Sequence, residues 1–229
     1  MDLTPIKALL FDKDGTLFDF HATWSAWAAN TLRDLAGGDE ALAERLAELL
    51  GYDLANETFR EDSSAIAGTL DEQALKLSSA LPGRTPQEIT LRLVELARDV
   101  PQVEVTPLAP LFDRLKGYTF GVATNDAEIV AHAQLRRAGI TEIFTFVAGA
   151  DSGFGGKPAP GQLHAFAEVT GLAPHEIAMI GDSTHDLFAA RAAGMVAVGV
   201  LTGPAGRAQL APHADHVIAS IAELPDLLR

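Results

Sequence analysis

The 229-residue sequence contains no cysteine, and aromatic residues make up only 7% of it. The missing cysteines exclude disulfide bonds, a thiolate nucleophile and any zinc site with cysteine ligands, but they do not identify a cellular compartment. No uninterrupted apolar stretch is long enough to cross a membrane, so we expect no membrane partner. Residues 1–5 lack the basic and then apolar layout of a secretory signal, which leaves the cytoplasm as the default expectation.

Basic residues are also few. Seventeen lysines and arginines stand against 31 aspartates and glutamates, which gives a formal net charge of −14. Nucleic-acid binding depends on basic patches that neutralise phosphates, so this balance argues against a nucleic-acid partner. The seven histidines are scattered, and none has the i, i+4 spacing of a zinc-binding helix. The length suits one good core with a smaller accessory domain.

The most informative segment that is present reads LLFDKDGTL, over residues 9–17. An apolar run that ends in turn residues predicts a buried strand, which is followed here by Asp12, Asp14 and a glycine turn. In open α/β sheets, ligands bind at the carboxyl ends of the strands. Two neighbouring carboxylates repel each other there unless a metal or a shared proton holds them. The pair therefore indicates a functional site, with an exposed acidic turn as the plain structural alternative.

The second half of the chain alternates helical and strand-like patterns. Each helical pattern ends at a glycine, which permits the left-handed conformation found after many helices. These helices are predicted at 106–116, 127–138, 160–170 and 184–193, before Gly117, Gly139, Gly171 and Gly194. Strands are predicted at 119–123, 143–148, 177–180, 196–200 and 216–218. Repeated strand–helix–strand units predict an α/β fold, a Rossmann-like parallel sheet with helices on both faces.

Residues 21–100 have a different character, with helical periodicity and little strand propensity. Trp24 and Trp27 share one helical face with Leu32, a pattern that is more typical of helix packing than of a substrate cage. A capping box at residues 85–88, with proline in the first helical position, predicts a helix to about residue 99. We therefore predict a discontinuous core, residues 1–17 and 106–229, and a helical insertion at 18–105 with hinges at 18–21 and 101–107.

Four motifs, taken in this order, resemble the haloacid dehalogenase superfamily in its phosphatase form. They are Asp12-Lys13-Asp14-Gly15-Thr16, Thr124-Asn125 after the apolar run 120–123, Gly155-Gly156-Lys157-Pro158, and Gly181-Asp182-Ser183-Thr184-His185-Asp186 after the run 177–180. Each motif alone is weak, since a threonine at a strand end or a lysine in a loop is usually structural. The resemblance covers the chain except about residues 18–105, and it implies that this insertion is a small α-helical cap domain that closes over the site and selects substrate.

The resemblance implies a Mg²⁺-dependent phosphomonoester hydrolase that acts through an aspartyl-phosphate on a small phosphorylated metabolite. Asp12 is the implied nucleophile, and Asp14 is the implied general acid and later the base. Asp12, the backbone carbonyl of Asp14 and Asp182 are the implied metal ligands, while Asp186 would hold the metal through water.

Three further residues receive roles from the same resemblance. Thr124, through its hydroxyl, and Asn125, through its backbone N–H, would bind phosphate oxygens at a helix N-terminus. Lys157 would bind phosphate too and balance the charge of Asp12 and the phosphoryl group.

Asp14 distinguishes branches within the superfamily. P-type ATPases share the lysine after the first aspartate but replace the second acid by threonine, and dehalogenases lack that acid as well. Sugar phosphomutases favour other acidic patterns around Asp182, and a phosphonatase requires a Schiff-base lysine in the cap, where Lys76 has ordinary amphipathic spacing. The sequence is most similar to phosphoglycolate phosphatase-like proteins, so 2-phosphoglycolate is the candidate substrate.

A small carboxylated substrate calls for a cation on the cap side of the site. Arg60 is the candidate, although a surface pairing with Glu61 or Asp62 explains this arginine equally well. Arg84 and Lys76 are weaker candidates.

The polar partners of Arg60 would be Ser63 and Thr69, and His21 and Trp24 either line the cleft or pack the hinge. A sugar-phosphate or nucleotide phosphatase is the alternative, and a non-catalytic binding or regulatory protein of the same fold is a further one. The sequence does not decide between a monomer and a homodimer.

Overall fold

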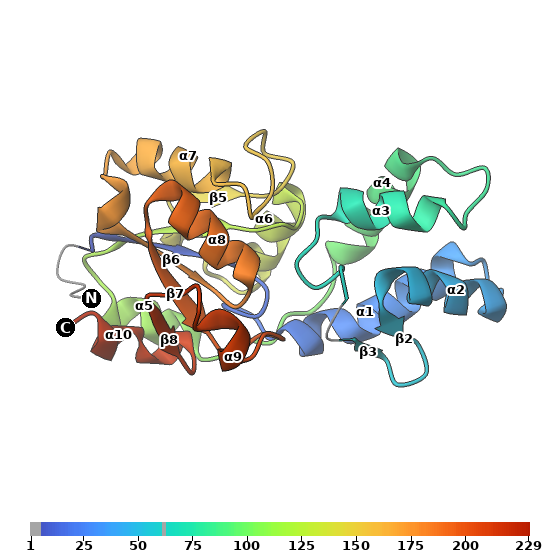
Figure 1. Cartoon of the computed structure of the whole chain (residues 1–229), viewed down its shortest axis with the longest axis horizontal. Coiled ribbons are helices and arrows are strands. Elements are labelled where there is room, and N and C mark those ends of the chain that lie inside the picture. The colour runs from blue at the N-terminus through green and yellow to red at the C-terminus, as the bar shows by residue number, and fades with distance from the viewer. Residues whose placement is uncertain (1–5, 61–62) are drawn as a thin grey trace.

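The computed structural model describes residues 6–60 and 63–229, which form an α/β core and a group of helices beside it (Figure 1). Glu61 and Asp62 lie outside the described residues. The core sheet has six strands in the order β5-β4-β1-β6-β7-β8, and all neighbouring pairs are parallel. Its strands are β1 (Ala8–Phe11), β4 (Thr119–Ala123), β5 (Phe146–Ala148), β6 (Ile177–Gly181), β7 (Val196–Val200) and β8 (His216–Ile218).

Alternate side chains of the strands enter two different hydrophobic layers. Leu9 and Phe11 of β1 share one cluster with α5 (Leu108–Arg114) and α10 (Leu224–Leu227). Ala8 and Leu10 share another with α7 (Gly161–Thr170) and α8 (Thr184–Ala193). Figure 1 shows these two pairs of helices on opposite sides of the sheet. The sheet is covered on both faces, which confirms the predicted α/β class.

The core helices lie close to their predicted positions. Gly171 and Gly194 adopt the left-handed conformation, with φ of 66° and 73°, directly after α7 and α8. The C-cap residues of α5 and α6 (Glu128–Arg137) are instead Leu115 and Ala138, so Gly117 and Gly139 lie beyond the caps. The strand predicted at 143–148 is shorter than expected, because residues 141–143 form a 3₁₀ turn before β5. A short α9 (Arg207–Leu210) follows β7.

The described part of the segment between β1 and α5 is mainly helical. It comprises α1 (Phe20–Leu35), α2 (Glu40–Leu50), α3 (Leu70–Ser78), α4 (Pro86–Ala97) and a short hairpin of β2 (Tyr52–Asp53) and β3 (Thr58–Phe59). Helix α4 begins with the predicted capping box between Thr85 and Glu88. These helices share a hydrophobic cluster, which Val130 of α6 also joins. Within the described residues, no helix combines the length and apolar character needed to span a bilayer.

The two segments that connect the core to this helical group run side by side. The Asp19 amide donates to the Val103 carbonyl at 2.8 Å, and the Val105 amide donates to the Leu17 carbonyl at 3.1 Å. Both connections between the core and the helical group therefore lie at one place, close to Asp14. We propose on this basis that residues 18–105 form one inserted cap unit, with residues 1–17 and 106–229 as the core.

The close approach of α7 to the sheet leads to a prediction about two strand glycines. A methyl group on Gly121 of β4 would lie 2.6 Å from the Phe166 ring, whereas one on Gly199 of β7 would have its nearest neighbour, Leu210, at 3.4 Å. We expect Gly121→Ala to lower the free energy of unfolding by about 2 kcal/mol, because extra atoms in a packed core force side chains to shift. Gly199→Ala, the matched control, should change it by less than about 0.5 kcal/mol. Equal midpoints in urea unfolding would contradict this packing.

Candidate active site

Polar residues that follow three adjacent strands meet at one edge of the sheet. Asp12 follows β1, Thr124 follows β4 and Asp182 follows β6, and β1 lies between the other two strands. The carboxyl ends of parallel strands lie at the same edge, so these side chains converge. All three line one cavity, the active-site cavity, to which Lys157 and Asp186 also contribute.

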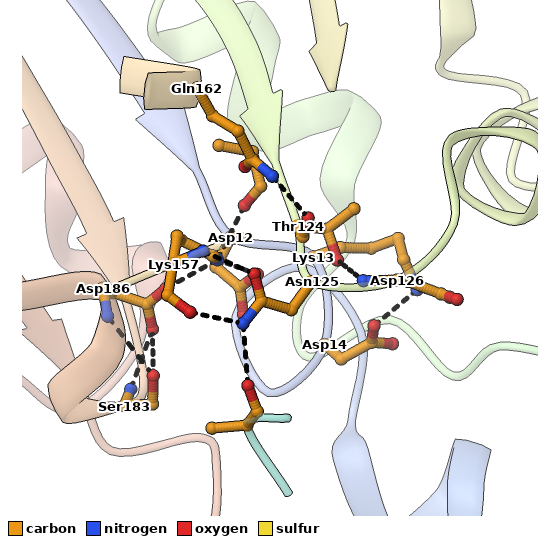
Figure 2. A network of polar contacts seen from close by, with 12 residues as sticks. Asp12, Lys13, Asp14, Thr124, Asn125, Asp126, Lys157, Gln162, Ser183 and Asp186 are labelled. Atoms are coloured by element: carbon orange, nitrogen blue, oxygen red, sulfur yellow. Dashed lines mark hydrogen bonds and ion pairs between the residues drawn. The ribbon is translucent and has the colours of Figure 1, made fainter. Parts of the chain in front are cut away.

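Lys157 is a buried cation at this edge of the sheet (Figure 2). Its Nζ lies 2.6 Å from Asp12 Oδ1 and 2.6 Å from Asp186 Oδ1, and it donates to the Ala123 carbonyl at 2.7 Å. Burial opposes the charged form, but the two carboxylates outweigh burial and raise the pKa of Lys157. The ammonium group therefore keeps its charge and joins the loop of Lys157 to the ends of β1 and β4.

Asp12, Asp182 and Asp186 form the aspartate cluster, in which one oxygen of each side chain lies within 4.8 Å of the others. Burial raises the pKa of Asp12 to about 7 against the opposing effect of Lys157, and Asp186 adds to the rise. Burial, followed by repulsion from Asp12 and Asp186, raises the pKa of Asp182 well above its ordinary value. One ammonium group thus faces three buried carboxylates, and the excess negative charge creates a demand for a further cation.

The surrounding loops leave room for these carboxylates. A Cβ atom on Gly15 or Gly203 would overlap the Asp182 carboxylate, and one on Gly181 would overlap that of Asp186. The Asp186 carboxylate also accepts a hydrogen bond from the Ser183 hydroxyl at 2.7 Å. All donor atoms of the cluster are oxygens, which suits a hard divalent cation such as Mg²⁺. The described residues therefore fit the metal that the sequence led us to expect.

Lys13 forms a second buried charge cluster beside the first, and the sequence analysis assigned it no role. Its Nζ lies 2.5 Å from Asp14 Oδ2 and 3.3 Å from Asp126 Oδ2, and it donates to the Gln134 side-chain oxygen (Figure 2). Burial opposes the charge, yet Asp14 and Asp126 raise the pKa of Lys13. The other Asp14 oxygen, Oδ1, is buried and has no hydrogen-bond partner. Lys13 thus holds Asp14 at the cavity and leaves one carboxylate oxygen unpaired.

Thr124 and Asn125 lie in the loop between β4 and α6. The Thr124 hydroxyl accepts a hydrogen bond from the Asp126 amide at 3.1 Å. The Asn125 side chain donates to the carbonyls of Ala67 and Lys157, both at 2.8 Å, and accepts from the Lys157 amide at 2.7 Å. Helix α6 begins beyond this loop, so neither residue lies in its first turn. Asn125 joins three loops, and the phosphate contacts of both residues stay predictions.

The basic residues selected in the cap do not line the cavity. The Arg60 guanidinium lies 3.1 Å from the Glu48 carboxylate at the surface. Lys76 is exposed and donates to the Ser64 hydroxyl, in a neighbouring groove, and Arg84 is also exposed. The structure therefore does not bring the predicted cap cations to the cavity.

The polar cap candidates are also engaged elsewhere. The buried Ser63 hydroxyl donates to the Leu50 carbonyl at 2.5 Å. Thr69 caps α3 through a reciprocal pair with Glu72, and His21 is exposed at the start of α1. None of these three is among the described residues that line the cavity.

The cap side of the cavity consists of residues that the sequence did not mark as site residues, apart from Trp24. Trp27 was interpreted with Trp24 as part of a packed helix face. We name the residues on this side the cap wall: Phe20, Trp24, Trp27, Phe59, residues 65–68, Leu70 and Gln73. Phe20, Trp24 and Trp27 follow one another at i, i+4 and i+7 along α1, directly after the Asp12 loop. That spacing was visible in the sequence, but it does not distinguish a cavity wall from a packed helix face.

The family can be assigned by comparison with known proteins. A family model described as haloacid dehalogenase-like hydrolase matches residues 6–194, which include every strand end that carries the aspartate cluster. The chain belongs to the haloacid dehalogenase-like hydrolases. The sequence-based resemblance is confirmed, and with it the assignment of this protein as an enzyme of the hydrolase class.

Relatives of this chain match most or all of its length. Phosphoglycolate phosphatase from Chromobacterium violaceum is 32% identical over 231 residues, covering 100% of this chain and 99% of that protein. The enzyme of the same name from Nitrosospira multiformis is 32% identical over 190 residues. The match covers 83% of this chain and 81% of the Nitrosospira protein. The crystal structure of a predicted phosphoglycolate phosphatase from Haemophilus somnus 129pt has a TM-score of 0.74 at 20% identity and 99% coverage of both chains, so it shares the fold.

The tight loops around Asp182 predict that a single methyl group disturbs metal binding. A Cβ atom in Gly203→Ala would push against the Asp182 carboxylate. In Gly206→Ala, in the same loop after β7, the Cβ atom would have its nearest neighbour, the Gln209 side-chain oxygen, at 3.9 Å. We expect Gly203→Ala to weaken Mg²⁺ binding about tenfold or more, because residues that position metal ligands carry effects of this size. Gly206→Ala should bind like the wild type. Equal affinities of the two variants in titration calorimetry would contradict the site.

The raised pKa of Asp182 predicts how stability depends on pH in the absence of a divalent cation. The folded protein holds this proton more tightly than the unfolded chain, so stability present below the ordinary value of 3.8 is lost as the pH rises through the folded-state pKa. With EDTA, we expect Asp182→Asn to raise the free energy of unfolding by about 1–3 kcal/mol near pH 8, with the gain shrinking toward about pH 4.

Urea unfolding across this pH range measures the effect. Asp113→Asn, which removes an exposed acid paired with Lys116, serves as the control and should change stability little. Magnesium should stabilise the wild type and not Asp182→Asn. A wild type that is as stable as Asp182→Asn at high pH in EDTA would contradict the buried repulsion.

Proposed function

We propose that this hydrolase is a Mg²⁺-dependent phosphomonoester phosphatase that acts through an aspartyl-phosphate on Asp12. The observation that carries the proposal is the aspartate cluster, which surrounds Lys157 at the strand ends and has Asp14 beside it. Two carboxylates one residue apart can divide nucleophile and acid between them. The names of the full-length relatives support the same class.

Asp12 is the proposed nucleophile. One of its oxygens attacks phosphorus while the bond from phosphorus to the ester oxygen breaks, which leaves the phosphoryl group on the carboxylate. Asp12, Asp182 and the backbone carbonyl of Asp14 would hold Mg²⁺ directly, with Asp186 holding it through water. The bound ion would neutralise charge on the phosphoryl oxygens. Lys157 already contacts Asp12 and adds fixed positive charge beside the nucleophile.

Asp14 is the proposed general acid and base. Its unpaired Oδ1 gives a proton to the departing ester oxygen and then takes one from the water that hydrolyses the aspartyl-phosphate. Lys13, bound to Oδ2, keeps the carboxylate in place during both steps. Asp14 itself ends each cycle in the protonation state in which it began.

The phosphate end of the cavity is proposed to include the Thr124 hydroxyl, the Asn125 amide and Lys157. For the rest of the substrate, the relatives make 2-phosphoglycolate the first compound to test, with sugar phosphates and nucleotides as alternatives. The cytoplasmic location and the absence of a nucleic-acid partner stay predictions.

Phosphate release tests the proposed reaction. We expect hydrolysis of phosphomonoesters that requires Mg²⁺ and falls at least about 10⁴-fold in Asp12→Asn, because removal of a covalent nucleophile abolishes the two-step path. Asp14→Asn should slow breakdown of the intermediate more than it weakens phosphate binding. Asp226→Asn, an exposed acid paired with Arg229, is the matched control and should keep full activity. Residual activity in Asp12→Asn equal to that of the wild type would exclude Asp12 as the nucleophile.

A further inference from the structure

The cap wall has an aromatic surface that faces the aspartate cluster. Phe20, Trp24 and Trp27 come from one face of α1, and Phe59 comes from β3. The rings contact one another edge to face, with centroids 5.3 Å apart for Phe20 and Phe59 and 4.9 Å apart for Trp24 and Trp27. Surfaces of this kind bind flat apolar groups through burial and ring packing.

The loop at residues 65–68 continues this surface with small apolar side chains, and Leu70 follows it. The Ala67 carbonyl accepts the 2.8 Å hydrogen bond from Asn125, and Asn125 in turn bonds to the Lys157 carbonyl. This connection fixes the loop beside the phosphate end of the cavity. The leaving group of a bound ester would therefore lie against apolar atoms.

Within the described part of the cap wall, no side chain carries a charge. The basic residues of segment 18–105 all lie in the described ranges, and they are engaged or exposed elsewhere. Arg33 pairs with Glu57, Arg60 with Glu48 and Arg92 with Asp34, Lys76 donates to Ser64, and Arg45, Arg84 and Arg98 are exposed. The two residues outside the described ranges, Glu61 and Asp62, are acids and supply no cation.

The core side of the cavity offers little positive charge for a second anion. It is lined by five aspartates, with Lys157 and His185 as the basic side chains among the described lining residues. Lys157 is engaged by Asp12 and Asp186 and serves the phosphoryl group. A carboxylate on the leaving group would be buried between apolar atoms and the carboxylates of Asp14 and Asp126, which already engage the Lys13 ammonium between them. It would therefore have no cation of its own, which is strongly unfavourable.

Two uncharged polar groups of the cap wall remain for recognition. The Trp27 indole N–H is buried and has no hydrogen-bond partner. The Gln73 side chain is nine-tenths buried, and its amide reaches the Ala65 carbonyl only at 3.5 Å. Both can donate to a neutral acceptor such as a carbonyl or hydroxyl oxygen.

We propose that the cap wall selects phosphomonoesters of uncharged, ring-containing alcohols and discriminates against carboxylated leaving groups. This inference rests on the proposed phosphatase function and specifies its substrate class. It also means that 2-phosphoglycolate, the substrate in the relatives' names, is a poor substrate of this enzyme.

A matched pair of substrates tests the inference. 4-Carbamoylphenyl phosphate and 4-carboxyphenyl phosphate have nearly the same shape and differ in the charge of one substituent. We expect kcat/KM to be at least about 30-fold higher for the carbamoyl ester, because a buried unpaired carboxylate loses its hydration. Equal values, or a preference for the carboxylate or for 2-phosphoglycolate, would overturn the inference.

Variants of Gln73 assign the discrimination to the cap wall. Gln73→Lys places a cation there and should reduce the ratio between the two esters at least about fivefold, while Gln73→Met, of similar length and uncharged, should keep carboxylate rejection. Trp27→Phe should lower kcat/KM for the carbamoyl ester more than for unsubstituted phenyl phosphate. It removes the N–H group together with part of the indole ring, and only the carbamoyl ester has an acceptor for that N–H. An unchanged ratio in Gln73→Lys would contradict the assignment to this wall.

The outcomes separate this inference from the proposed function. Mg²⁺-dependent hydrolysis of both esters, with the carboxylate preferred and the preference lost in Lys76→Met, would keep the phosphatase and overturn the inference in favour of the neighbouring groove. Release of phosphate no faster than in Asp12→Asn, for every ester, would overturn the proposed function and the inference that rests on it.

Discussion

The contact on which the site depends is that of the Lys157 ammonium with Asp12 and Asp186, at 2.6 Å from each. Carboxylates gathered at adjacent strand ends repel one another when they are buried, and Lys157 offsets part of that repulsion. The remainder shows in the raised pKa values of Asp12 and Asp182, whose first cause is burial. The protein therefore carries an electrostatic cost in its folded state, and a divalent cation bound at the aspartate cluster would relieve it.

Lys13 provides the same kind of support one residue further along the chain. It lies between Asp14 and Asp126, with the Trp24 ring 5.3 Å from its Nζ. The same aromatic residue belongs to the cap wall, so the lysine that orients the proposed acid also underlies the surface that the leaving group meets. In the proposed function, positioning of the acid and selection of the substrate would therefore both involve Trp24. The cap differs from the core in having no charged side chain on its described cavity surface.

The core could be predicted from the sequence because its signals are local. A buried strand ends at Asp12 and another at Asp182, and the parallel order of the sheet brings these ends together without further information. The cap could not be predicted in this way. Arg60 was selected for its charge, but it pairs with Glu48, which comes from α2. The buried Lys13 ammonium donates a hydrogen bond to Gln134, which lies 121 residues away in the sequence. Such contacts arise from tertiary packing, which no short pattern records.

The most direct test of the central claim is the mass of the enzyme after acid quenching during turnover with phenyl phosphate and Mg²⁺. Asp14→Asn extends the lifetime of the intermediate, and peptide mapping then locates the modification. The account predicts one added phosphoryl group on the peptide that contains Asp12, absent in EDTA and absent when Asp12→Asn is combined with Asp14→Asn. An unmodified enzyme during Mg²⁺-dependent turnover, or a phosphoryl group on another residue, would contradict it.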